Sequence, residues 1–207
     1  MYLPKHFKAE AAETQELLDG IRVADLVTAT DQGLFATFLP LIYDYSRDGE
    51  GVLLGHVARK NDHWRLDPVG EALVIAHGPE AYITPAWYAA KQEHGRVVPT
   101  WNYLTAHIYG ELVIHDDPAW LEALVRRLTD RHEAEREQPW SVDDAPREYT
   151  ESQLQAIVGI ELRITRVQAK AKLGQNRSAQ DIDSVTSGLR ERGDEALAQA
   201  TTRARRN

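Results

Sequence analysis

The feature that most limits the fold of this chain is the stretch from Val97 to Asp116, where side chains alternate in character. Its even-numbered positions, such as Ala106 and Ile108, are apolar and should face a core, because a period of two is typical of a strand with one buried side. The opposite face carries aromatic residues, which favours a ligand shelf or a subunit contact. The alternative is a second apolar layer beneath a helix. The odd-numbered positions hold Trp101, Tyr103, Thr105, His107 and Tyr109.

A second long strand is predicted from Ile157 to Lys172, and its alternation changes phase. Apolar residues occupy even positions up to Ile164 and odd positions from Val167 onward. A slip of one residue moves every later side chain to the other face, so we expect a bulge or bend at Thr165-Arg166. There the strand could pass between two sheets.

Shorter strands complete the pattern. Ile21–Thr30 and Leu34–Tyr43 flank Asp31-Gln32-Gly33 and predict a hairpin. Pro40 in the second arm indicates an edge or a bulge, because proline cannot donate to a ladder. Val52–Ala58 is a buried strand. Ala72–Ala76 is another, which we expect Gly78-Pro79 to break before extended chain resumes at Ala81–Thr84.

Helices are expected near the two ends of the chain and in its middle. Lys8–Asp19 should form a helix stopped by Gly20, and Asp117-Pro118 is a strong helix start. Ser178 should cap a helix that Gly193 ends. The residues after it, Thr201–Asn207, suggest a basic, frayed tail. The turn and loop predictions are Ser46–Gly51 and Gln92–Arg96.

Because the strands are short, sequential and not in regular βαβ alternation, the pattern favours a mostly antiparallel barrel with bends. The chain has 207 residues, enough for one domain with a small appendage. It has no cysteine, which excludes disulfides and thiolate chemistry. No apolar run approaches membrane-spanning length, and a cytoplasmic protein is expected. The net charge of −8 argues against a broadly nucleic-acid-binding surface.

Two basic corners stand out. In the first, the strand Val52–Ala58 ends at Arg59-Lys60, and Asn61 is a good N-cap for the turn that holds Trp64. Cationic side chains and free backbone N–H groups at such a junction suit a phosphate, although a solvated surface turn is an equal alternative. In the second, Lys170 and Lys172 share one strand face and lead toward residues 175–177.

The chain resembles the PaiB-type FMN-binding negative transcriptional regulators over nearly its whole length. Several ordered motifs carry the resemblance, and together they are more specific than any one alone. Two positions depart from the family pattern: Phe38 stands where a histidine is usual, and Gly174 where a serine is usual. The motifs are Met1–Phe7, Gly55–Asn61 with Trp64, Gly78–Ile83 with Trp87-Tyr88, Val98–Tyr103, Ile157–Gly159 and Lys172–Arg177.

The resemblance implies a mainly β, α+β fold: a Greek-key antiparallel split β-barrel like that of flavin reductases and pyridoxamine-phosphate oxidases. It implies an FMN-binding barrel domain over residues 1–177 and a helical extension over 178–207 packed on the barrel. It also implies a homodimer with FMN at the subunit interface. A site completed by a second subunit would not require the two basic corners to meet within one chain.

The resemblance and the two corners together give a set of expected flavin contacts. Arg59 would hold the phosphate, with Asn61 and Thr100 as neutral donors, and Lys172, Gln175 and Arg177 would close the site or meet the phosphate. Trp101 and Tyr103 would pack on the ring. No catalytic residue and no metal site are assigned. The expected cofactor-binding residues are His56, Ala58, Arg59, Asn61, Trp64, Thr100, Trp101, Asn102, Tyr103, Lys172, Gln175, Asn176 and Arg177.

Other functions stay open. A flavin-dependent oxidoreductase needs few catalytic side chains, because the cofactor carries the chemistry. A haem-degrading enzyme on the same barrel would need an axial histidine, for which His56, His63 and His107 are the candidates. A decayed site that binds nothing is a third possibility. DNA binding is weakly supported, since only the tail arginines 203, 205 and 206 offer phosphate contacts.

Overall fold

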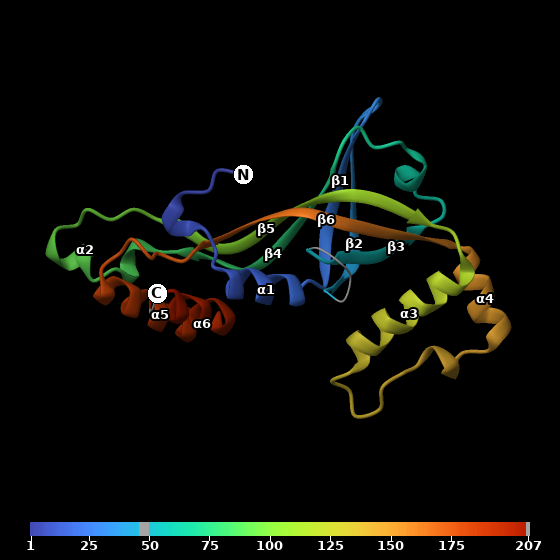
Figure 1. Ribbon diagram of the computed structural model, residues 1–207. Helices are drawn as coiled ribbons and strands as arrows, with labels where there is room; N and C mark the ends of the chain where they lie inside the picture. The colour runs from blue at the N-terminus through green and yellow to red at the C-terminus, as the bar shows by residue number, and fades with distance from the viewer. Residues whose placement is uncertain (46–49, 206–207) are drawn as a thin grey trace. The chain divides into compact units, whose positions relative to one another are not determined.

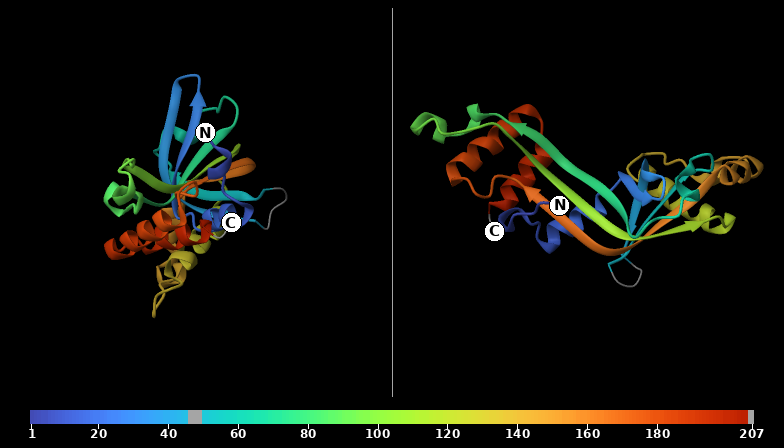
Figure 2. Two further views of the ribbon diagram at one scale, coloured as in Figure 1. Left: turned by 90° about the vertical axis from the view of Figure 1, so that its left-hand side faces the viewer. Right: turned by 90° about the horizontal axis from the view of Figure 1, so that it is seen from above.

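The computed structural model describes residues 1–45 and 50–205, so part of the predicted turn Ser46–Gly51 and the end of the predicted tail lie outside it. The chain folds into two compact units, each built from separate stretches of sequence. Unit 1 comprises Met1–Gly20, His77–Ala106 and Gln168–Asn207, and unit 2 comprises Ile21–Ala76 and His107–Val167. Figures 1 and 2 show the elements. The predicted division after Arg177 stays a prediction.

Six strands form one closed barrel in the order β1-β2-β3-β6-β5-β4. The registered pairs of β1 with β2 and β4, of β2 with β3, and of β3 with β6 are antiparallel. The antiparallel β fold with flanking helices is therefore confirmed. The strands are β1 (Val23–Thr30), β2 (Gly33–Asp44), β3 (Val52–Ala58), β4 (Ala72–Ile83), β5 (Thr100–His115) and β6 (Ile157–Lys172).

Helices flank these strands. Among the described residues, no helix is long and apolar enough to cross a membrane. In unit 2 they are η2 (Asp62–Arg65), α3 (Pro118–Glu133), η4 (Val142–Asp144) and α4 (Arg147–Gln155). In unit 1 they are η1 (Lys5–Phe7), α1 (Ala11–Asp19), η3 (Pro85–Trp87), α2 (Ala90–Glu93), α5 (Ala179–Arg192) and α6 (Glu195–Ala204).

The caps predicted from the sequence are present. The Asp117 side chain accepts from the Trp120 N–H at the start of α3, and Ser178 accepts from the Asp181 N–H at the start of α5. Gly193 ends α5 with φ of 89°, a left-handed conformation that favours glycine. Each of these caps involves residues that are close together in sequence, which is why they could be predicted from the sequence alone.

Strand β6 shows the predicted phase change. Val158 to Leu162 are all buried, and Ile164 is buried after the exposed Arg163. Thr165 and Arg166 are then both exposed, and Ala169 to Ala171 are buried after them. The boundary between the two units falls immediately beyond, between Val167 and Gln168. The slip predicted from the alternation therefore marks the place where this strand leaves one unit and enters the other.

Other predictions were wrong. Strand β2 is not an edge: its residues up to Pro40 pair with β1, and those from Leu41 pair with β3, so the proline sits where the partner changes. Gly78-Pro79 does not break β4, which runs through to Ile83. A Cβ on Gly78 would lie 2.9 Å from the Leu104 Cβ, so this glycine allows β4 to approach β5 closely.

The ends of some helices were also missed. The predicted loop at Gln92–Arg96 begins inside the short helix α2, and the predicted frayed tail is helical as far as Ala204. Helix α4 was not predicted, because its mean hydropathy is low and only Thr150 and Leu154 are buried. A mostly polar segment gives a weak periodic signal.

In unit 2, α3 covers one face of the sheet. Leu124 and Leu128 pack against Ile42, Val52 and Leu54. Trp120 packs beside them and lies against Gly159 of β6, where an added Cβ would come within 2.2 Å of the indole. Because even the smallest side chain would overlap the ring, this position requires glycine.

Candidate functional site

The first basic corner comprises His56, Ala58, Arg59, Asn61 and Trp64 and is called the β3 corner below. The Arg59 guanidinium already makes hydrogen bonds within the protein. Arg59 Nε donates to the Gln155 carbonyl at 2.7 Å, and Nη2 donates to the Ile157 carbonyl at 3.0 Å. Both terminal nitrogens also bind the Asp116 carboxylate, which lowers the pKa of that carboxyl. Arg59 therefore ties the end of β3 to two other segments of unit 2.

The turn after Arg59 is equally well ordered. The Asn61 side chain accepts from the His63 N–H at 2.9 Å, as an N-cap should, and also donates to the Thr37 hydroxyl at 3.2 Å. The Trp64 indole N–H donates to the Arg59 carbonyl at 3.0 Å. The corner prediction was thus correct about local structure.

Two histidines near this corner differ in their surroundings. His63 is fully buried, and its Nε2 and Nδ1 lie 2.9 and 2.8 Å from the hydroxyls of Thr28 and Thr37. Both ring nitrogens are therefore engaged, so His63 is a poor candidate for a haem ligand. His56 has a buried Nδ1 without a partner, and burial lowers its pKa, which keeps the ring neutral.

The second basic corner lies in unit 1, and we call it the Lys172 cluster: Thr100, Trp101, Tyr103, Lys170, Lys172 and Arg177. Lys172 Nζ donates to the Thr100 hydroxyl at 2.6 Å and also to the Trp101 carbonyl. The centre of the Tyr103 ring lies 5.4 Å from the Lys170 ammonium and 5.8 Å from the Lys172 ammonium. Strands β5 and β6 thus bring both ammonium groups to one tyrosine.

Positive charge in this cluster is not neutralised. Among the residues that the structure describes, no ion pair joins Lys170, Lys172 or Arg177 to a carboxylate. Burial lowers the pKa of Lys172, and the charges of Lys170 and Arg177 lower it further. Because an anion placed here would relieve that repulsion, the cluster is suited electrostatically to a phosphate.

An aromatic shelf adjoins the cations. Trp101 is 53% exposed, and its ring meets that of Tyr82 edge to face with centroids 6.2 Å apart. Tyr82 is itself 41% exposed. Exposed rings next to an unneutralised cation cluster offer a surface for a flat aromatic ligand. Trp101 and Tyr103 are accessible at this end of β5, and the use of this face by a ligand or a subunit stays a prediction.

The loop that follows β6 holds its own shape. Gln175 accepts from the Leu173 N–H and donates to the Ala171 carbonyl, so its amide is used internally. The Arg177 guanidinium lies 4.8 Å from the centre of the Tyr88 ring. Asn102 is buried and lines a small pocket with Arg177, whereas Asn176 is exposed.

The structure thus groups the predicted residues into two sets, one in each unit. Sequence reasoning placed Lys170 in the second basic corner but not among the expected flavin contacts, and it missed Tyr82. It also missed a pocket of about 470 Å³ beside Arg177 and Gln175, to which the N-terminal residues Lys5 and Lys8 contribute. The lysines of the N-terminal segment were the feature of the sequence that could have indicated this pocket.

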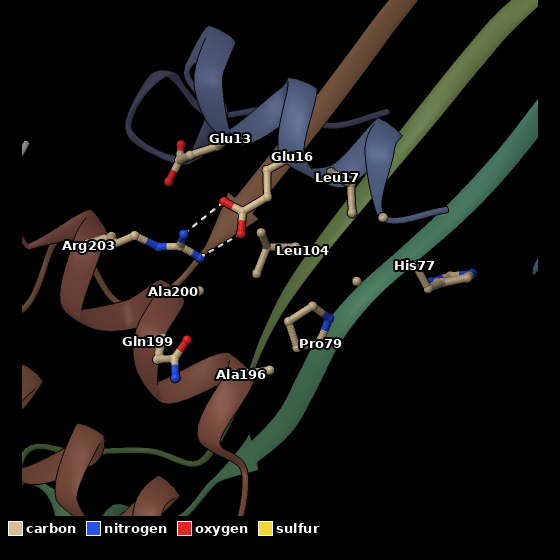
Figure 3. Close-up of a pocket in the computed structure, with 12 residues that line it drawn as sticks. Glu13, Glu16, Leu17, His77, Pro79, Leu104, Ala196, Gln199, Ala200 and Arg203 are labelled. Atoms are coloured by element: carbon tan, nitrogen blue, oxygen red, sulfur yellow. Dashed lines mark hydrogen bonds and ion pairs between the residues drawn. The ribbon is translucent and has the colours of Figure 1, made fainter. Parts of the chain in front are cut away.

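A second pocket in unit 1, of about 280 Å³, is drawn in Figure 3. Its lining includes the apolar residues Leu17 and Leu104 and the Arg203–Glu16 ion pair, which joins α6 to α1 at 2.9 Å. Arg203, considered above as a contact for nucleic acid, is thereby held against a carboxylate.

Comparison with known proteins shows the family to which the chain belongs. Residues 1–166 match the family described as "Putative FMN-binding domain". The chain belongs to this family. It is also 34% identical over 193 residues to the Protease synthase and sporulation protein PAI 2 of Bacillus subtilis, covering 91% of this chain and 89% of that protein. The PaiB-type family resemblance is confirmed.

Two further matches extend this picture. An uncharacterized protein of Emericella nidulans is 32% identical over 95% of this chain and 93% of its own length. The flavocytochrome Anf3 from Azotobacter vinelandii has a TM-score of 0.55 at 14% identity, over 80% of this chain and 68% of that one. The FAD and haem binding protein from Mycobacterium smegmatis has the same score at 17% identity, over 87% and 80%. At such identities these structures support the fold alone.

FMN is the cofactor of this family, and the residues of the Lys172 cluster fit it. A flavin mononucleotide combines a phosphate with a flat ring system. The cluster combines cations that lack carboxylate partners with exposed aromatic rings. When bound, the flavin supplies electron transfer, and the chain supplies binding and orientation.

Proposed function

We propose that the protein is a homodimeric FMN-binding regulator in which the flavin phosphate is held by Lys172 and Arg177, with Lys170 close by. Trp101 and Tyr103 pack against the ring in this proposal. The observation that carries it is the state of Lys172, a partly buried ammonium fixed by two oxygens and surrounded by like charge.

The β3 corner is a weaker choice for the phosphate. Arg59 already donates to one carboxylate and two carbonyls, so an incoming phosphate would have to displace existing bonds. Lys172 lacks an anionic partner among the described residues. Charge-assisted bonds contribute most where the cation has none already. The other predicted contacts, including His56, Ala58, Asn61, Trp64 and Asn176, stay predictions.

Titration of FMN into the purified protein, followed by flavin fluorescence, tests this proposal. Lys172→Gln should raise the Kd roughly 10- to 150-fold, the loss expected for one hydrogen bond to a charged group. Lys91→Gln, at an exposed lysine on α2, is the matched control and should leave the Kd unchanged. Equal affinity in the wild type and Lys172→Gln, or no FMN binding at all, would contradict the proposal.

The regulatory part of the proposal rests on the resemblance to the PaiB-type negative transcriptional regulators. Two of the tail arginines expected to meet DNA are held in ion pairs, Arg203 with Glu16 and Arg205 with Asp183, and the third, Arg206, lies outside the described residues. Direct DNA contact by these residues is therefore not favoured, and regulation could use other surfaces.

A gel shift at low salt with a random duplex library, with and without FMN, tests direct DNA contact. We expect at most weak binding that disappears as salt rises, and no further loss when residues 203–207 are deleted. Tight, salt-resistant binding that the deletion abolishes would overturn the assignment of these arginines to internal ion pairs.

A further inference from the structure

The pocket of about 470 Å³ in unit 1 is not explained by FMN binding at the Lys172 cluster. Its lining comes from the N-terminal segment, the loop after β6 and helices α5 and α6, all of which belong to this unit. A volume of this order suits a small organic ligand. We call it the α5 pocket.

The α5 pocket is rich in cations that lack anionic partners. Lys5, Lys8 and Arg177 line it, and within the described part of the chain none of them forms an ion pair with a carboxylate. The remaining guanidinium of the lining, that of Arg205, is held by Asp183. Because the chain as a whole has a net charge of −8, a local group of unpaired cations favours an anionic ligand.

The walls of the pocket are fixed by bonds within the protein. Lys8 pairs with Lys170 of β6 in an isolated bridge, and the N–H of the next residue donates to the Ala169 carbonyl at 3.1 Å. On the other side, both ends of the Gln175 amide bond the backbone of its own loop. A ligand would therefore lose little affinity to the ordering of these walls.

Two carboxylates line the same pocket. Glu10 and Glu13 form the capping box at the start of α1, in which the Glu13 carboxylate accepts from the Glu10 N–H at 2.9 Å. A carboxylate has about four lone-pair sites, so each keeps acceptor capacity after this use. Fixed carboxylates beside phosphate-binding groups are typical acceptors for ribose hydroxyls.

Apolar side chains complete the lining. Ala179 and Ile182 come from α5, and Ala204 comes from the end of α6. They provide apolar surface for the face of a base, next to the charged groups. Cations, fixed carboxylates and apolar surface in one pocket match the three parts of a nucleotide: phosphate, ribose and base.

We propose that the α5 pocket binds a nucleoside monophosphate group, with its phosphate on Lys5, Lys8 and Arg177. The inference rests on the proposed function, because Arg177 also belongs to the Lys172 cluster and would serve the flavin phosphate as well. Two sources supply this chemistry. One is the adenylate half of FAD, and the other is a separate nucleotide bound beside FMN.

Equilibrium dialysis of AMP against the full chain, with and without FMN, tests the inference. AMP should bind at one saturable site, and more tightly than inorganic phosphate does. Lys5→Gln combined with Lys8→Gln should raise the Kd for AMP roughly 10-fold or more, because charged donors to the phosphate are lost. Lys91→Gln combined with Arg96→Gln removes two exposed cations elsewhere in unit 1 and should leave the Kd unchanged.

A second readout blocks the pocket without changing its charge. Ala179 and Gln180 are both exposed in the first turn of α5, but only Ala179 lines the pocket. Ala179→Trp should therefore abolish AMP binding, whereas Gln180→Trp should not. Equal thermal midpoints of the two variants would show that the loss is not caused by unfolding.

FAD distinguishes the two sources of the nucleotide. If the adenylate is part of FAD, FAD should displace AMP, and the double variant at Lys5 and Lys8 should weaken the binding of FAD but not of FMN. If the nucleotide is separate, AMP should bind to protein saturated with FMN, and FAD should be no better a ligand than FMN. Either result supports the α5 pocket.

Other outcomes overturn the inference. It is wrong if the double variant at Lys5 and Lys8 binds both AMP and FAD as the wild type does, or if neither compound binds. Inorganic phosphate that binds as tightly as AMP would overturn the assignment to a nucleotide. Absence of FMN binding overturns the proposed function instead, and AMP dialysis of flavin-free protein still tests the pocket by itself.

Discussion

The two basic corners look alike in sequence, yet the structure uses them differently. Arg59 is bound to a carboxylate and two carbonyls from segments far along the chain. Lys172 is fixed by a hydroxyl and a carbonyl, with other cations as its charged neighbours. The comparison shows that a cationic side chain is available to a ligand only where the fold leaves it without an anion.

The largest expected effect is on flavin affinity. If Lys172 and Arg177 hold the phosphate, Lys172→Gln combined with Arg177→Gln should weaken FMN binding by roughly 100-fold or more, because both charged donors to the phosphate are lost. Arg59→Lys should change the Kd less than about 3-fold. Fluorescence titration measures both. A larger effect from Arg59→Lys than from the double variant would reverse the assignment.

A smaller effect is expected from the aromatic shelf. Trp101→Ala should weaken FMN binding by roughly 2- to 12-fold, which corresponds to about 0.5–1.5 kcal/mol for an aromatic contact. The same titration, together with the shift of the flavin absorption band, measures it. Trp140→Ala, at another half-exposed tryptophan, is the control and should have no effect on either signal.

Substitutions in the β3 corner should instead lower the stability of the fold. Arg59→Ala removes donors from Asp116 and from the carbonyls of Gln155 and Ile157, so the urea midpoint should fall. Arg65→Ala breaks an exposed pair with Asp62, one long bond to a carbonyl and a contact 4.9 Å from the centre of the Trp64 ring, and should lower the midpoint less. If both variants unfold at the wild-type midpoint, Arg59 does not stabilise the corner.

The smallest effects should appear in the pH dependence of stability. The Arg59 hydrogen bonds lower the pKa of Asp116, so this contribution is present above the unfolded value of about 3.9 and is lost as the pH falls through the lower folded value. Asp116→Asn should flatten that part of the curve of urea midpoint against pH.

Lys172 should affect the stability of the fold at alkaline pH. Burial lowers its pKa, so the unfolded chain binds more protons and stability rises with pH between the folded pKa and the unfolded value of about 10.4. Bound FMN should remove this rise, since a phosphate restores the ammonium pKa. Urea midpoints with and without FMN measure the difference, and an identical rise in both would contradict phosphate binding at Lys172.

Much of the fold could be predicted because its signals are local. The hairpin, the caps at Asp117 and Ser178, and the phase slip at Thr165-Arg166 each depend on neighbours in sequence. The partner of Arg59 could not be predicted in this way, because Asp116 is 57 residues distant along the chain. The edge expected at Pro40 was wrong because β2 changes its pairing partner from β1 to β3 at this proline.

Gly159 shows that a family motif can be diagnostic without touching the ligand. The Ile157–Gly159 motif contributes to the resemblance, yet its glycine makes room for the Trp120 indole and so serves the architecture of unit 2. A genetic screen for colourless, flavin-free protein would recover substitutions at this position as readily as those at Lys172. Only the solubility and heat resistance of the purified variants would tell the two causes apart.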